Sequence, residues 1–333
     1  MYQTPFHTKN ISGSSFLVTG GAGFIGSNLV EYLLKYKAGR VVVLDNLATG
    51  FAANIKPFEN EPNFKFLQGD ITQAADCKKA SEGIDYILHQ AALGSVPRSI
   101  ENPLATHVVN ETGFIQLLIA ARDAKVKRIV YASSSSVYGD ITDLPKTEAR
   151  IGKQLSPYAV SKRGNELYAE IFAKTYQMEI IGLRYFNIFG PRQNPLGAYA
   201  AAIPLFIDAF LKNQPPAING DGKQTRDFTF VENAVQANIR AVLAEGIPAQ
   251  GEVFNVAVGE RISLNDLISI LKKLTGSTVQ PSYRADRIGD VKDSLADIQK
   301  ARRELGYVPG VMMEEGLRKT ISWFHQKEVQ AIK

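Results

Sequence analysis

Phe16-Leu17-Val18-Thr19-Gly20-Gly21-Ala22-Gly23-Phe24-Ile25-Gly26 is the stretch of sequence that decides the fold. Its first four residues are apolar or β-branched and predict a short buried strand. The glycines that follow permit a tight turn and let backbone N–H groups approach a phosphate. The next residues, 27–34, have a helical pattern of apolar positions. A strand, a glycine turn and a helix in this order predict a site for the pyrophosphate of a dinucleotide.

A second strand carries the next part of this prediction. Arg40-Val41-Val42-Val43-Leu44 is followed by Asp45, at the distance from the glycines where an acid can bind the adenosine ribose diol. The negative charge of Asp45 would repel a 2′-phosphate on that ribose. We therefore expect NAD rather than NADP as the cofactor.

Composition excludes several other classes of function. The chain has 333 residues, of which 45% are hydrophobic and 21% charged, as in ordinary globular proteins. Its net charge of +5 is spread along the sequence, so we expect no nucleic-acid partner. Cys77 is the only cysteine, which excludes an internal disulfide and a thiolate metal cluster, and we expect no metal. Because no apolar run reaches 18 residues and residues 1–13 lack a signal-peptide core, we expect a cytoplasmic protein without a membrane partner.

Strands and helices alternate through the first half of the chain. Further strands are predicted at 64–67, 84–89, 128–132 and 179–185, with helices at 73–82, 103–124 and 157–177. This alternation predicts an α/β fold with a doubly wound parallel sheet, whose ligands lie beyond the carboxyl ends of the strands. The second half contains many prolines, and its helices are predicted near 199–212, 232–245, 263–275 and 313–327.

A possible catalytic group lies in Ser156-Pro157-Tyr158-Ala159-Val160-Ser161-Lys162. Tyr158 and Lys162 are four residues apart and share one face of the predicted helix. A free tyrosine has a pKa near ~10, and a lysine ammonium together with a cationic nicotinamide would lower it toward ~7, which requires about 4 kcal/mol. The serine run 133–136 at the end of a strand can add a hydroxyl. These groups predict proton transfer at a substrate alcohol.

With these features, the chain resembles the extended short-chain dehydrogenase/reductase family over about residues 15–326, and within it the nucleotide-sugar 4-epimerases. Its closest similarity is to the branch that acts on UDP-N-acetylglucosamine and UDP-N-acetylgalactosamine in bacterial surface-polysaccharide pathways. The segments 92–99 and 191–195 carry this finer match. The family match also includes Gly69-Asp70-Ile71, Gln90-Ala91-Ala92, Tyr185-Phe186-Asn187, Thr225-Arg226-Asp227-Phe228 and Arg287-Ile288-Gly289-Asp290.

The resemblance implies a two-domain architecture and a reaction. An NAD-binding Rossmann domain would comprise residues 1–189 and about 226–258, and a smaller C-terminal α/β domain for the UDP-sugar would comprise about 190–225 and 259–333. Tyr158 would remove the O4 proton while a hydride leaves C4, with Ser134 bound to the same oxygen and Lys162 holding the nicotinamide ribose. The resulting 4-keto sugar would turn over and take the hydride back on its other face, so that NAD stays bound.

The resemblance also implies the remaining site residues and an assembly. The NAD site would comprise Gly20, Gly23, Phe24, Ile25, Gly26, Asp45, Asn46, Asp70, Ile71, Ala91, Ala92 and Lys162. UDP would contact Asn187, Arg226, Arg287 and Asp290. The sugar pocket would be lined by Gly94, Ser135, Ser136, Gln193, Ala201 and Ser294. The apolar faces of helices 103–124 and 157–177 would pair with a second copy in a homodimer.

Other reactions remain to be weighed on the same scaffold. A dehydratase needs an added acid/base pair beside the catalytic hydroxyl, and Ser135 and Ser136 stand there instead. A UDP-N-acetyl-uronic-acid 4-epimerase or a UDP-sugar decarboxylase is a closer alternative, because Arg98 or Arg192 could bind a C6 carboxylate. A non-catalytic dinucleotide sensor is the alternative from another class, although such a protein would not need Ser134, Tyr158 and Lys162 together.

Overall fold

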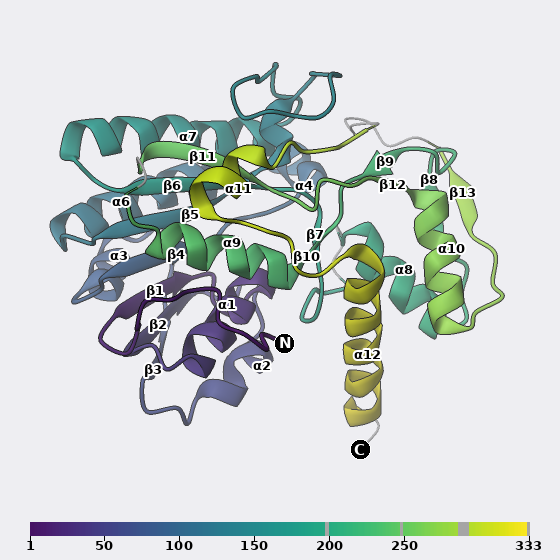
Figure 1. The fold of residues 1–333 in the computed structure, drawn as a ribbon, viewed down its shortest axis with the longest axis horizontal. Coiled ribbons are helices and arrows are strands. Elements are labelled where there is room, and N and C mark those ends of the chain that lie inside the picture. Colours follow the sequence, from purple (N-terminus) through teal and green to yellow (C-terminus); the bar gives the residue numbers. More distant parts are fainter. Residues whose placement is uncertain (197–199, 247–248, 286–292, 332–333) are drawn as a thin grey trace.

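A seven-stranded parallel sheet forms the centre of the molecule (Figure 1). The computed structural model describes residues 1–196, 200–246, 249–285 and 293–331. The strand order is β11-β6-β5-β4-β1-β2-β3, and all six neighbouring pairs are parallel. This confirms the doubly wound Rossmann sheet, which β11 extends beyond the strands predicted from sequence. The strands are β1 (Ser15–Thr19), β2 (Arg40–Asp45), β3 (Phe64–Gln68), β4 (Tyr86–His89), β5 (Arg128–Ser134), β6 (Ile180–Tyr185) and β11 (Gln250–Val256).

The strand order changes direction at β1, and this change positions the site. β1 lies between β2 and β4, so that Thr19 pairs with Leu44 on one side and with His89 on the other. After β1, the chain adds β2 and then β3 on one side of β1, whereas β4, β5 and β6 are added on the other side. In parallel sheets a crevice opens at such a point, beyond the carboxyl ends of the strands. The glycine turn after β1, Asp45 and the segment after β4 therefore meet at one edge.

Helices cover both faces of the sheet because its buried strands carry apolar residues on both sides. Phe16 and Val18 pack into a core with α1, α9 and α11, whereas Leu17 packs into a second core with α3, α6 and α7. Figure 1 shows these two helical layers on either side of the strands. Their bounds are α1 (Phe24–Lys35), α3 (Ala74–Ser81), α6 (Gly113–Asp123), α7 (Pro157–Tyr176), α9 (Val231–Leu243) and α11 (Gln299–Leu305), and α2 (Ala52–Ile55) follows β2.

The helix predicted at 103–124 has three parts. It consists of α5 (Pro103–His107), a π-helical turn at Val108–Thr112 and α6. The side chain of Asn102 accepts a hydrogen bond from the backbone N–H of Ala105 at 3.0 Å and caps its start. A short helix, α4 (Val96–Glu101), precedes it, and 3₁₀ turns occur at Lys56–Phe58 and Ser135–Tyr138.

A smaller group of elements lies beside one end of the sheet (Figure 1). Its core joins α8, α10 and α12 to the buried aromatic residues Phe189 and Phe230. The bounds are α8 (Ala202–Leu211), α10 (Leu264–Thr275), α12 (Met313–Ala331), β7 (Ile188–Phe189), β8 (Ala217–Asn219), β9 (Thr225–Arg226), β10 (Thr229–Phe230), β12 (Ile262–Ser263) and β13 (Ser282–Arg284). The predicted division into two domains stays a prediction. Helix α11 belongs to the range 259–333 of the predicted UDP-sugar domain, and it packs against β11 and α9. No helix in the described part of the chain is long and apolar enough to cross a membrane.

Candidate active site

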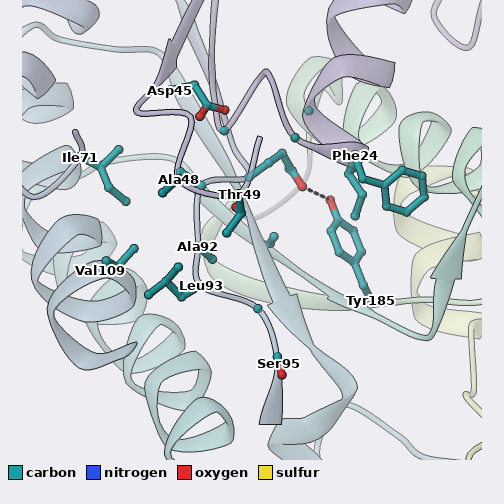
Figure 2. Close-up of a pocket in the computed structure, with 18 of the residues that line it drawn as sticks. Phe24, Asp45, Ala48, Thr49, Ile71, Ala92, Leu93, Ser95, Val109 and Tyr185 are labelled. Atoms are coloured by element: carbon teal, nitrogen blue, oxygen red, sulfur yellow. Dashed lines mark hydrogen bonds between the residues drawn. The ribbon is translucent and has the colours of Figure 1, made fainter. Parts of the chain in front are cut away.

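A cavity of about 700 Å³ opens where β1, β2, β4 and β5 end. Figure 2 shows part of its lining, with Asp45 and Ser95 at opposite ends of the view and Tyr185 on one side. The predicted NAD residues Gly20, Gly23, Phe24, Ile25, Gly26, Asp45, Asn46, Asp70, Ile71, Ala91, Ala92 and Lys162 all line it. Ser134 and Tyr158 line the same cavity. The structure therefore brings together the two groups of residues that the sequence predicted separately.

The glycine turn at the head of the cavity has no room for side chains. Gly20 has a φ of +68°, and a Cβ there would lie 2.6 Å from the backbone nitrogen of Ala91. A Cβ on Gly26 would overlap the carbonyl oxygen of Gly20. The N-cap of α1 is Gly23, which makes no side-chain capping bond, so the first-turn N–H groups are not capped by it. This cradle fits the pyrophosphate of a dinucleotide.

Two carboxylates lie at the ends of neighbouring strands. Asp45 accepts hydrogen bonds from the backbone N–H groups of Ala22, at 2.9 Å, and Leu47, at 2.8 Å. Burial raises the pKa of Asp45, and these two bonds oppose the rise. Asp70 accepts a hydrogen bond from the Asn46 side chain at 2.8 Å. Both carboxylates are held in place as acceptors, which is the chemistry that a ribose diol requires.

The proton-transfer group lies on β5 and α7. Tyr158 lies beside Ser134, and the Lys162 ammonium, 3% exposed, donates to the carbonyl oxygen of Ala132 at 2.8 Å. Burial lowers the pKa of Lys162 to about 8. Burial also raises the pKa of Tyr158, and the neighbouring Ser134 opposes this rise. Lys162 is 6.0 Å from the centre of the Tyr158 ring and donates to a carbonyl. The lowered pKa predicted from the sequence depends also on a bound cationic nicotinamide, so it stays a prediction.

Two parts of the cavity wall were not predicted as functional. Tyr185 donates to Gln90 at 3.1 Å, the Gln90 amide donates to Asn238 at 3.1 Å, and Asn238 donates back to Tyr185 at 2.7 Å. Figure 2 shows the first of these bonds. Elsewhere, the Asn110 side chain holds both the N–H and the carbonyl of Leu93, at 2.8 and 3.2 Å. These partners are far apart in sequence, and no local pattern signals them.

The residues predicted to bind UDP and the sugar fall into four groups. Gly94, Asn187, Gln193 and Ala201 line the cavity. Ser135, Ser136 and Ser294 are not among the described residues that line it; Ser136 instead donates to the Ser134 hydroxyl at 2.9 Å, and the N–H of Ser294 donates to the carbonyl of Thr225 at 3.1 Å. Arg226 lines an adjoining cavity of about 300 Å³, which shares Ser95, Asn187, Ile188 and Ala201 with the first. Arg287 and Asp290 lie outside the described residues.

The structure also places the two arginines that the sequence left open. Arg192 forms an ion pair with Glu31 on α1 and donates to the carbonyl oxygen of Ser27 at 3.3 Å. Arg98 is on α4. Neither is among the described residues that line the two cavities, in which the cationic side chains are Lys162 and Arg226.

Comparisons with known proteins agree with this geometry. The NAD dependent epimerase/dehydratase family matches residues 16–257. A UDP-glucose 4-epimerase of Mycolicibacterium smegmatis is 38% identical over 93% of this chain and 98% of its own. The structure of a UDP-N-acetylglucosamine 4-epimerase from Methanobrevibacter ruminantium M1, in complex with UDP-N-acetylmuramic acid, is 37% identical, with a TM-score of 0.89 over 94% of this chain and 99% of its own. A UDP-glucuronic acid 4-epimerase from Bacillus cereus, in complex with UDP-glucuronic acid and NAD, is 34% identical, with a TM-score of 0.87 over the same shares.

The match covers most of the chain and includes the parts of the sheet that form the cavity. The residues that surround the cavity fit NAD, and the proton-transfer group lies within it. This chain belongs to the NAD dependent epimerase/dehydratase family and is an NAD-dependent enzyme.

Proposed function

We propose that the chain catalyses the reversible C4 epimerisation of a UDP-sugar, and that this sugar is UDP-N-acetylglucosamine, converted to UDP-N-acetylgalactosamine through a 4-keto intermediate. The observation that carries the proposal is that Ser134, Tyr158 and Lys162 line the same cavity as the dinucleotide cradle. A sensor of dinucleotides would need the cradle alone. The names of the relatives support the same class of reaction.

Each residue of the proton-transfer group has a separate task. Tyr158 takes the proton of the sugar O4 hydroxyl and later returns it, as a general base and then a general acid. Ser134 lies beside Tyr158 and favours its phenolate form. Lys162 is held beside the cavity by its bond to Ala132, where it would hold the nicotinamide ribose. NAD held in the glycine cradle would supply the acceptor for the C4 hydride and the donor for its return.

The adjoining cavity supports a UDP site. It opens into the first through shared residues, so a ligand can extend from the catalytic group toward Arg226. A guanidinium provides paired donors that match diphosphate oxygens. The amide nitrogen of Asn187, which lines both cavities, donates to the carbonyl of Asp227 at 3.0 Å and fixes that side chain. Arg287 and Asp290, outside the described residues, are proposed from the family resemblance to contact UDP as well.

Gln193 supports the preference for an N-acetylated sugar. Its amide nitrogen donates to the carbonyl of Ile188 at 3.1 Å, which fixes the orientation of the side chain. Its carbonyl oxygen is buried and has no hydrogen-bond partner among the described residues. A buried acceptor of this kind favours a ligand with an N–H or O–H donor. The acetamide of the sugar provides an N–H, and Gly94 and Ala201 nearby take up little volume.

A uronic-acid substrate remains the alternative, because one of the similar enzymes acts on such a sugar. Its C6 carboxylate would require a cation in the pocket. Arg192 is bound by Glu31, and Lys162 is bound to a carbonyl of β5. These contacts favour the uncharged sugar over the uronic acid, and over the decarboxylase reaction that starts from one.

The test is incubation of purified protein with UDP-N-acetylglucosamine, without added NAD, followed by chromatography of the nucleotide sugars. We expect a mixture with UDP-N-acetylgalactosamine from either direction and NAD or NADH in the denatured protein. UDP-glucose, UDP-glucuronic acid and UDP-N-acetylglucosaminuronic acid serve as parallel substrates. Faster turnover of a uronic acid than of the N-acetylated sugar would overturn the substrate assignment while preserving the reaction class. Absence of epimerisation of every substrate would overturn the function itself.

We also propose that a second copy of the chain covers one face of the molecule. α5 and α7 pack together, and both carry large apolar side chains in solvent, including Leu104 at 70% and Ile171 at 58% exposure. A patch that pairs with itself across a two-fold axis gives a closed dimer. Ile171→Glu should shift the sedimentation of a dimer to that of a monomer, whereas Lys174→Glu, on the same helix, should not.

A further inference from the structure

A buried carboxylate lies one helical turn beyond Lys162. Glu166 is 3% exposed and accepts four hydrogen bonds. Its Oε1 accepts from Ser133 Oγ at 2.7 Å and from Arg184 Nε at 2.8 Å. Its Oε2 accepts from Arg184 Nη2 at 2.9 Å and from Arg163 Nη1 at 3.0 Å. Because Ser133 and Arg184 are paired neighbours on β5 and β6, one carboxylate ties α7 to two strands.

The Glu166–Arg184 pair is fully charged and well satisfied. Burial acts to raise the pKa of Glu166, but the hydrogen bonds and charge of Arg184 outweigh it and hold that pKa below its ordinary value. Arg184 is 1% exposed; it also donates to the carbonyl of Glu148 at 3.0 Å and lies 4.9 Å above the ring of Tyr138. Buried ion pairs add little stability over apolar side chains of the same volume. Stability alone therefore gives no reason for this pair.

The contacts between α7 and β5 point to another role for this buried pair. Tyr158, Lys162 and Glu166 are spaced one turn apart on a single face of the helix. Each of them lies against one of three consecutive residues of the strand: Lys162 bonds the carbonyl of Ala132, Glu166 bonds the hydroxyl of Ser133, and Tyr158 lies beside Ser134. Tyr158 and Lys162 face the cavity, whereas Glu166 is anchored in the protein interior.

We propose that Glu166 is a positioning residue, which through Ser133 fixes the place of α7 on β5 and thereby the position of Tyr158 beside Ser134. The proposal rests on the proposed function in one respect, that Tyr158 exchanges a proton with the sugar hydroxyl. The hydroxyl of Ser134 favours the phenolate form of Tyr158. If α7 moves away from β5, Tyr158 moves away from Ser134, so the pKa of Tyr158 rises and fewer molecules hold the base in its active form.

The experiment compares Ser133→Ala, Ser133→Thr and Glu166→Gln with the wild-type holoenzyme. Ser133→Ala removes one bond to Glu166 and leaves the ion pair with Arg184 in place. We expect kcat to fall roughly 10-fold with KM for the UDP-sugar changed less than about twofold, because the loss is in catalytic geometry rather than binding. Ser133→Thr keeps the hydroxyl and should retain activity. Arg163→Gln is the matched control, since Arg163 bonds the same carboxylate from the surface without reaching β5.

The pH profile separates positioning from a general loss of structure. The rising limb of kcat/KM reports the ionisation of the base in the free enzyme, and we expect it to move upward by about half a pH unit in Ser133→Ala and further in Glu166→Gln. A lower fraction of folded protein would reduce the rate without moving the limb. Should Glu166→Gln not fold, Ser133→Ala decides the question. The proposal would be overturned if Ser133→Ala had the same kcat as the wild type and a rising limb of kcat/KM at the same pH.

A second readout distinguishes failure of this proposal from failure of the proposed function. The pKa of Tyr158 can be measured by NMR on isotope-labelled tyrosine rings, with Tyr158→Phe to assign the signal. If the wild type epimerises no UDP-sugar, the function is wrong, yet a raised Tyr158 pKa in Ser133→Ala would still support the positioning role. If the wild type is active and the Tyr158 pKa is the same in both proteins, the positioning role alone is wrong.

Discussion

Lys162→Met should stabilise the nucleotide-free protein while removing its activity. The Lys162 ammonium is buried, and burial lowers its pKa from 10.5 to about 8. At pH 7 the unfolded chain therefore carries this charge at no penalty, whereas the folded chain must desolvate it. A pKa shift of this size lowers the free energy of unfolding by about 3 kcal/mol at pH 7. Methionine fills a similar volume without charge, but it loses the bond to Ala132, which is worth about 1 kcal/mol. The free energy of unfolding of Lys162→Met should therefore exceed that of the wild type by about 2 kcal/mol.

The sign of the pH dependence follows from the direction of the shift. Between pH 8 and 10.5 the unfolded chain binds more protons than the folded chain at this position, so the free energy of unfolding of the wild type rises with pH there. The cost of burying the charge of Lys162 is present in full below pH 8 and decreases as the pH rises toward 10.5. The advantage of Lys162→Met should accordingly be largest at pH 7 and close to zero near pH 10.

Urea unfolding of both proteins at pH 7 and pH 10, followed by circular dichroism, measures this difference. Nucleotide must be absent, because bound NAD would add its own binding free energy to the folded state. Lys174→Met is the control: Lys174 lies on the same helix in an exposed pair with Glu170, and its replacement should change stability little at either pH. A variant less stable than the wild type at pH 7, or a gain that is the same at both pH values, would refute the reasoning.

Three further substitutions test other parts of the site. Tyr158→Phe should lower turnover by at least ~100-fold while NAD content and UDP-sugar affinity, measured by calorimetry, stay near those of the wild type; wild-type turnover would refute the assignment of the base. Gly20→Ala places a Cβ 2.6 Å from the Ala91 nitrogen at a φ of +68°, so it should cost about 1–2 kcal/mol in strain and abolish NAD retention, as nucleotide release on denaturation would show; Gly13→Ala, with no atom within 4 Å, is its control. Ser294→Tyr should reduce kcat/KM for UDP-N-acetylglucosamine more than for UDP-glucose, and an unchanged ratio would exclude Ser294 from the sugar pocket.

Local patterns in the sequence were sufficient for most of the sheet and for the cofactor cradle. The apolar strands, the glycines at 20, 23 and 26, and Asp45 act through chain geometry within one βαβ unit, and a unit of that kind folds in few ways. The pairing of Tyr158 with Lys162 was equally accessible, because residues four apart on a helix share a face. The parallel, doubly wound sheet was predicted from the alternation of strands and helices, although β11 was missed, since its residues carry no clear alternation of apolar and polar positions.

The tertiary structure decided what surrounds those residues and how their charges behave. Burial raises the pKa of Tyr158 and lowers that of Lys162, and burial is a property of the packed molecule. The anchoring of Glu166 by Ser133 and Arg184, and of Arg192 by Glu31, depends on contacts between segments distant in sequence. A sequence fixes which side chains are available through short-range rules, whereas their partners, and hence their pKa values and their access to a ligand, are set only when distant elements pack together.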